Sequence, residues 1–231
     1  MSKRQHPSAR RKPQSANEQD DAFVAGVIDF SEWARQHRQM LTLLVITGVI
    51  LVAGGLYYVN FQRTLRIQAV NLLEEIHQTI AISATEDAKA QLSSYLESFE
   101  GTDQAREAVI ILGRLHLESG DAPVAISVLE RADLGFRDPI GVQGNSLLAR
   151  AYENQGRWPE AEDTFLEVAD RAELDFQIRG ALDSAARVRR RQQDYIGAAE
   201  LYERIIATFE ENDPARGLYQ LRLAEMREIQ S

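Results

Sequence analysis

The pattern of apolar and polar residues divides this chain into three parts. The first part is polar and charged, and it ends at a run without a single charged residue, MLTLLVITGVILVAGGLYYVNF, at positions 40–61. At about 1.5 Å per residue, a helix over this run is about 33 Å long, which matches a bilayer core of about 30 Å. The run therefore predicts a transmembrane helix over 40–61, followed by a domain over 62–231.

A cleaved signal peptide is the main alternative for this run. Signal peptides have an apolar stretch of about 7–15 residues and a cleavage site formed by small residues. Here the run is longer, and it ends in LYYVNF without such a site. Tyr57, Tyr58 and Trp33 suit the two membrane interfaces. We therefore expect a retained anchor.

The segment before the anchor divides in two. Residues 1–19 are polar and lack apolar periodicity, which predicts a disordered basic tail. This tail either contacts anionic lipid or nucleic acid or, as the simpler interpretation, only sets the topology. Residues 20–39 place apolar residues at steps of three and four, which predicts a juxtamembrane amphipathic helix that lies on the membrane or against a partner.

From residue 62 onward the sequence is typical of helix throughout, and between about 106 and 212 it repeats. Three segments align in register: ILGRLHLESGDAPVAISVLERA, LARAYENQGRWPEAEDTFLEVA and SAARVRRRQQDYIGAAELYERII. Each has a small residue in its first helix, an alanine twelve positions later and a large residue four positions after that. The aligned positions recur after 36 and then 37 residues; they are Gly113, Ala149 and Ala186, then Ala125, Ala161 and Ala198, and finally Leu129, Phe165 and Tyr202.

Turn residues separate the two helices of each copy. The first two copies have Gly120 and Gly156, and the third has Gln193 in the same place. Small residues let two antiparallel helices approach closely, and stacked hairpins bury a continuous core that one hairpin alone cannot form. Residues 214–230 are expected to form a closing cap helix, and residues 62–99 a degenerate first hairpin.

These residues resemble the tetratricopeptide repeat family, with small residues at the helix crossing, Gly in the turn and Ala then an aromatic residue in the second helix. The resemblance implies an all-α fold, a solenoid of helical hairpins behind a single transmembrane helix. The third copy departs from the pattern, because Gln193 replaces the turn glycine and Arg189 a buried aromatic residue.

The architecture is also similar to the bacterial ancillary Sec-translocon subunit, a single-pass membrane-anchored repeat protein. That resemblance implies a scaffold that recruits exported proteins or chaperones to a membrane machine such as the Sec translocon. A structural subunit that stabilises a membrane complex through its transmembrane and juxtamembrane helices is the alternative. Replacement of the anchor separates the two hypotheses.

Charge bears on orientation and on partners. Residues 1–39 contain seven Lys/Arg and five Asp/Glu. The rest of the chain contains nineteen Lys/Arg and thirty Asp/Glu, which gives it a net charge of −11. The positive-inside rule places the tail in the cytoplasm and the domain on the extracytoplasmic, periplasmic side of the inner membrane. An acidic domain argues against nucleic acid as a partner, so other proteins are expected.

The sequence contains no motif typical of catalysis, nucleotide binding or metal binding. The chain has no cysteine, its four histidines lack the spacing of metal ligands, and nucleotide-binding, nucleophile and zinc-protease motifs are absent. We therefore expect no enzyme, no catalytic or metal residues, no cofactor and no small-molecule substrate. His116 occupies a helix-packing position equivalent to that of Tyr152.

One set of residues indicates a binding surface. The position after each small crossing residue is an arginine, Arg114, Arg150 and Arg187, and Arg190 lies one turn beyond the last. In tetratricopeptide arrays this position faces the concave groove, so the arginines are candidates for binding carboxylates or acidic peptide segments. The alternative is that each arginine pairs locally, as Arg150 does with Glu153 if the i,i+3 pair forms.

Overall fold

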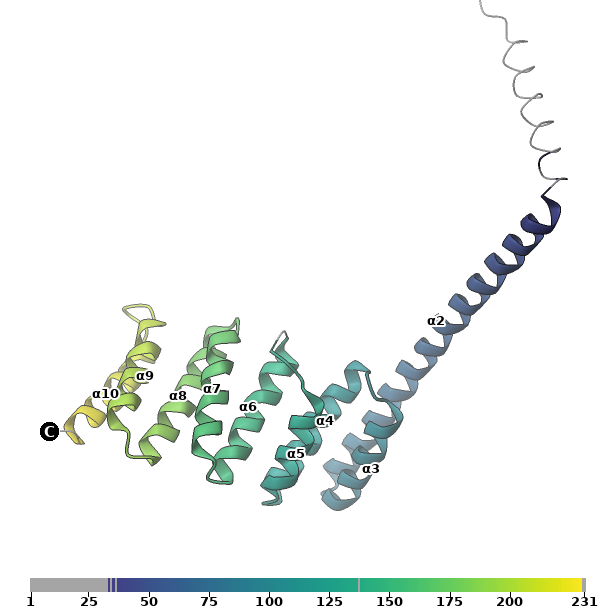
Figure 1. Cartoon of the computed structure of the whole chain (residues 1–231). Coiled ribbons are helices and arrows are strands. Elements are labelled where there is room, and N and C mark those ends of the chain that lie inside the picture. Colours follow the sequence, from purple (N-terminus) through teal and green to yellow (C-terminus); the bar gives the residue numbers. More distant parts are fainter. Residues whose placement is uncertain (1–32, 34, 36, 137, 230–231) are drawn as a thin grey trace, which may run out of the picture. The chain divides into compact units, whose positions relative to one another are not determined.

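The computed structural model describes residues 33, 35, 37–136 and 138–229. The expected tail (1–19) and most of the expected juxtamembrane helix (20–39) therefore lie outside the described residues. The chain divides into two compact units, residues 1–62 and 63–231, and each is described by itself. Every regular element in the described part is a helix, which confirms the predicted all-α class (Figure 1).

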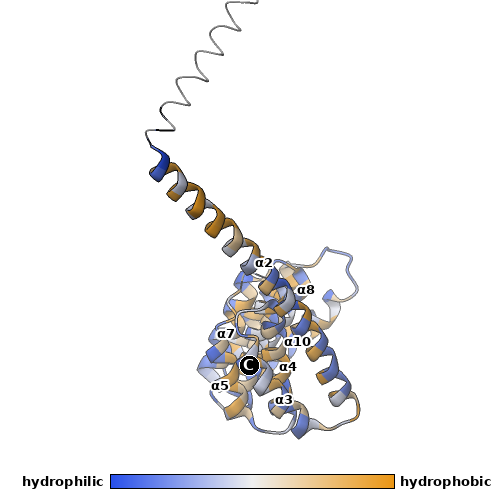
Figure 2. Ribbon diagram, turned by 90° about the vertical axis from the view of Figure 1, so that its right-hand side faces the viewer, coloured by the Kyte–Doolittle hydropathy of each residue, from blue (hydrophilic) through white to orange (hydrophobic). Residues whose placement is uncertain are grey.

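The first described helix, α2 (Arg38–Ala81), carries the apolar run. Its first half is the most hydrophobic segment of the chain in Figure 2. The large apolar side chains from Leu43 to Phe61 are 49–73% exposed among the described residues. By length and composition, α2 is the one described helix that is able to cross a membrane.

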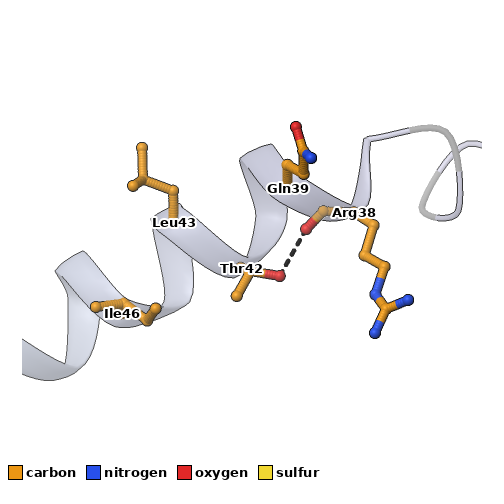
Figure 3. A pocket seen from close by; sticks show the side chains of 5 residues that line it. All are labelled: Arg38, Gln39, Thr42, Leu43 and Ile46. Carbon is orange, nitrogen blue, oxygen red and sulfur yellow. Dashed lines mark hydrogen bonds between the residues drawn. The ribbon is translucent and has the colours of Figure 1, made fainter.

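The start of α2 passes from polar to apolar within about two turns (Figure 3). Arg38 and Gln39 come first, and the Thr42 hydroxyl donates a hydrogen bond to the Arg38 carbonyl at 2.6 Å. Leu43 and Ile46 follow on the next turn. Polar side chains followed by apolar ones are typical of a helix that passes from the membrane interface into the bilayer core.

In the second unit, the C-terminal half of α2 packs against α3 (Thr85–Ser98). Leu73 and Ile76 of α2 and Leu92 of α3 are buried together. The Tyr95 hydroxyl of α3 donates a hydrogen bond to the Ala69 carbonyl of α2 at 2.9 Å. Burial raises the pKa of Tyr95 to about 12, with Glu107 adding to the shift.

Three further helical hairpins and a final helix follow, standing side by side in chain order (Figure 1). Their bounds are α4 (Asp103–Glu118), α5 (Ala122–Ala132), α6 (Pro139–Asn154), α7 (Trp158–Arg171), α8 (Asp175–Arg191), α9 (Tyr195–Ala207) and α10 (Arg216–Ile229). Prolines occupy the first turns of α5, α6 and α7, where a missing N–H breaks no helical hydrogen bond.

The helix crossings are buried at the residues that the repeat alignment selects. The five alanines among the crossing residues have no exposed surface, and Leu129, Phe165 and Tyr202 are at most 3% exposed. At Gly113, a β-carbon would lie only 3.0 Å from the Leu129 side chain. The predicted register of the three hairpins therefore agrees with the packing.

The turns within the hairpins share one backbone conformation. Gly120 and Gly156 have φ of +78° and +72°, and Gln193 has φ of +65°. A residue with a side chain is disfavoured in this left-handed region. The third hairpin therefore keeps the turn of the other two in spite of its different residue.

The last helix, α10, covers the end of the array against α9. Met226 of α10 has no exposed surface, and the rings of Tyr219 and Tyr202 lie 6.4 Å apart between centroids.

Candidate protein-binding face

The four candidate arginines lie on the first helices of three successive hairpins. Arg114 is on α4, Arg150 on α6, and Arg187 and Arg190 on α8. Arg114, Arg150 and Arg190 are exposed, and none of these three forms an ion pair within the residues that the structure describes. Arg187 differs from the other three, because its side chain is only 36% exposed.

Arg187 forms a two-point ion pair with Glu153 of the preceding hairpin. Its Nε and one terminal nitrogen donate to the two carboxylate oxygens at 3.0 and 2.8 Å. Arg191 approaches the same carboxylate at 3.6 Å, and the Glu153 side chain is only 12% exposed. The hydrogen bond to Glu153 raises the pKa of Arg187, against the effect of burial. Arg187 thus joins α8 to α6.

The local pair between Arg150 and Glu153 that the sequence suggested is wrong. Glu153 instead accepts hydrogen bonds from Arg187, because the next hairpin places a guanidinium directly over it. Arg150 is consequently left exposed and without an ion pair in the described part of the chain. Of the predicted set, Arg187 has its charge neutralised locally, and Arg114, Arg150 and Arg190 remain available.

A second cross-helix pair was missed by the sequence reasoning. Arg222 of α10 donates a hydrogen bond to Asp183 of α8, one turn before Arg187. The same guanidinium carbon lies 5.4 Å from the centroid of the Tyr219 ring. Burial raises the pKa of Tyr219, and the charge of Asp183 adds to that effect.

Two of the ion pairs between helices share one spacing in the sequence. Glu153 precedes Arg187 by 34 residues, and Asp170 precedes Arg204 by the same 34, with a hydrogen bond of 3.0 Å between the latter two side chains. This separation is shorter than the repeat by two or three residues. An acidic residue 34 positions before an arginine is therefore a candidate for an ion pair between neighbouring hairpins, although Glu97 and Arg131 have the same spacing and form none in the described part of the chain.

Arg189 shows how the third copy accommodates a charge at an aromatic packing position. Its Nε lies 2.7 Å from a carboxylate oxygen of Glu162 on α7. Asp194 and Glu200 approach the same guanidinium at 3.8 and 3.7 Å. Three carboxylates compensate for burial of the guanidinium to 21% exposure.

The described residues do not assemble a metal site, since no three His, Asp or Glu side chains among them are grouped to hold an ion. His116 packs as predicted, with a 15% exposed side chain. Its Nδ1 lies 3.4 Å from a carboxylate oxygen of Asp121.

Comparison with known proteins agrees with this architecture. Residues 31–139 match the family model of a tetratricopeptide repeat-like domain, and residues 146–179 match a tetratricopeptide repeat. No curated protein sequence matches the chain.

Solved structures give the same fold. The nearly identical TPR-like repeats of a kinesin light chain from Podosopora anserina have a TM-score of 0.56 at 20% identity, over 68% of this chain and 84% of theirs. A tetratricopeptide repeat protein from Parabacteroides merdae has a TM-score of 0.57 at 16% identity, over 69% of this chain and 60% of its own. Repeats of this kind generally mediate protein–protein interactions and are typically not catalytic. The chain carries tetratricopeptide repeat-like domains, and repeats of this kind are typical of protein-interaction scaffolds.

Proposed function

We propose that this protein is a membrane-anchored scaffold that binds other proteins. The observation that carries the proposal is that one chain joins an exposed apolar helix to an array of tetratricopeptide-like hairpins. Apolar side chains exposed at 49–73% from Leu43 to Phe61 are unfavourable in water. A bilayer removes this surface from water, and the hairpins are then free to present their faces to partners.

The orientation follows from charge. The seven Lys/Arg of residues 1–39 favour a cytoplasmic amino terminus, which puts the hairpins on the extracytoplasmic side of the inner membrane. There the scaffold recruits exported polypeptides or chaperones to a membrane machine. The Sec translocon is the machine that the architectural resemblance favours.

The arginine face is the proposed contact surface for these partners. Arg114, Arg150 and Arg190 are exposed cations without an ion pair in the described part, on a domain whose overall charge is negative. Arginine binds carboxylates through two parallel hydrogen bonds, so acidic peptide segments suit this face. Arg187 stabilises the array rather than binding a partner, because its guanidinium already donates two hydrogen bonds to Glu153.

Topology is tested with protease added to spheroplasts. We expect the protease to remove the hairpin domain and leave a short membrane-bound fragment. A domain that stays intact until the membrane is lysed contradicts the proposed orientation.

Partner binding is tested with a photo-crosslinker at the exposed Gln143 of α6 in intact cells and identification of the captured proteins. The variant R114Q/R150Q/R190Q, with the crosslinker at the same position, should capture less of the same proteins. Exchange of the anchor for an unrelated transmembrane helix should leave capture unchanged. If only the exchange of the anchor reduces capture, the protein is instead a structural subunit that acts through its membrane helix.

A further inference from the structure

A groove lies between α3, α4 and α5, and the arginines of the candidate face do not line it. Its volume is about 680 Å³, within the range of about 300–1,000 Å³ typical of ligand sites. The floor is apolar and includes Leu96, Val109, Leu112 and Val128. Leu96 and Val128 are half-buried, so part of this apolar surface remains in contact with water.

Exposed charged side chains lie on both sides of the groove. Glu97 on α3 and Glu100 just after it line one side, and Arg131 on α5 and Asp133 just after it line the other. All four side chains are exposed, and none forms an ion pair within the described residues. The groove thus offers an apolar floor with an acidic side at Glu97 and Glu100, opposite Arg131 and Asp133.

At the equivalent positions later in the array, an acidic residue and an arginine form an ion pair. Asp170 on α7 and Arg204 on α9 form an ion pair at 3.0 Å across the gap between those helices. Glu97 and Arg131 are the equivalents of Asp170 and Arg204, since each precedes its counterpart by 73 residues, which is the sum of the two repeat intervals. Glu97 and Arg131, on the two sides of the groove, therefore do not form the ion pair that Asp170 and Arg204 form at the equivalent positions.

We infer that this groove binds a polypeptide segment of a partner protein. An aliphatic side chain of the segment fills the floor, and a Lys or Arg of the segment faces Glu97 and Glu100. Charge complementarity and the apolar floor favour a peptide with this composition over a small polar molecule. The inference rests on the proposed protein-binding function and adds a second contact surface to it.

The test uses the full chain in lipid nanodiscs and a random dodecapeptide phage library. Peptides selected on the wild type are synthesised, and their affinities are measured by fluorescence anisotropy. Ser93 is exposed and lines the groove, so Ser93→Trp blocks it without changing the buried core. Ser94 is exposed on the same helix but does not line the groove, so Ser94→Trp is the matched control.

We expect the selected peptides to combine an aliphatic residue with a nearby Lys or Arg. They should bind the Ser94→Trp protein like the wild type and the Ser93→Trp protein at least about tenfold more weakly. Glu97→Lys should weaken binding about fivefold, and a peptide with its basic residue changed to Glu should regain the loss. This charge exchange tests the site even if Ser93→Trp perturbs folding.

The variant R114Q/R150Q/R190Q separates this site from the arginine face. It should bind the selected peptides with unchanged affinity, whatever its effect on partner capture in cells. The inference is overturned if no peptide is enriched, if the enriched peptides lack the expected composition, or if they bind the Ser93→Trp protein as tightly as the wild type.

Discussion

Arg187 of one hairpin holds Glu153 of the preceding hairpin by two hydrogen bonds, of 3.0 and 2.8 Å. The carboxylate is only 12% exposed, so the pair is largely removed from water. A charge left alone in such a position is unfavourable, whereas the paired charges tie α6 to α8. One member of the predicted arginine set therefore stabilises the array.

This pair is testable by a double-mutant cycle on the fragment 62–231. Glu153→Gln and Arg187→Gln should each lower the free energy of unfolding by about 1–2 kcal/mol, because each leaves a partner without its charged hydrogen bonds. The two losses should not add, since both remove the same interaction. Urea unfolding measures the three variants. Arg150→Gln is the matched control, because Arg150 is an exposed arginine without an ion pair in the described part of the chain, and a loss there as large as for Arg187→Gln contradicts the assignment.

The turn at Gln193 predicts a stabilising substitution. Gln193 has φ of +65°, a conformation that costs a residue with a side chain about 1–2 kcal/mol. Gln193→Gly should therefore raise the free energy of unfolding by up to about 1 kcal/mol, with some of the gain lost to the greater freedom of glycine in the unfolded chain. The reverse change, Gly156→Gln at φ of +72°, should lower it. Shifts of the same sign for both variants speak against a shared turn conformation.

The helix crossings predict a position that does not tolerate a larger side chain. Ala161 of α7 has no exposed surface, and overpacking a well-packed core typically costs about 1–3 kcal/mol. Ala161→Leu should lower the thermal unfolding midpoint of the fragment 62–231 clearly. The same substitution at Ala224, which is exposed on α10, should leave the midpoint nearly unchanged. Equal effects at the two positions contradict the repeat register.

Asp138 predicts a response to acid. The guanidinium of Arg106, and then the amide of Gly141, lower the pKa of the Asp138 carboxyl from 3.8 to about 2. Because this pKa is lower in the folded than in the unfolded chain, the associated stability is complete above about pH 4 and is lost as the pH falls through about 2. Arg106→Gln should therefore move the pKa of Asp138 up toward 3.8.

Carbon-13 NMR titration of the Asp138 carboxyl measures this change. Arg227→Gln on α10 removes an arginine that pairs with Glu203 instead, and it should leave the pKa of Asp138 where it is. If Arg106→Gln leaves this pKa at about 2, the amide of Gly141 rather than the guanidinium sets it.

Much of the fold was predictable because it depends on periodic features. The apolar run from 40 to 61 and the small residues at intervals of 36 and 37 each follow from one requirement, burial of apolar surface. The conformation of Gln193 was not predicted, because a residue with a side chain is disfavoured at the left-handed φ that Gly120 and Gly156 adopt. The partner of Glu153 could not be predicted from spacing. Arg150, three residues away on the same helix, and Arg187, 34 residues away on another helix, are both within reach of an ion pair by spacing alone.

The sequence by itself determined the class of the protein: an apolar helix able to cross a membrane and a row of hairpins whose small residues meet at the crossings. The tertiary structure decided which arginines are available and which are held, and where the array leaves a groove. The physical reason is that burial acts on every repeat alike, whereas an ion pair depends on the offset between two particular helices. That offset brings Asp170 to Arg204 and leaves Glu97 and Arg131 unpaired on opposite sides of the groove.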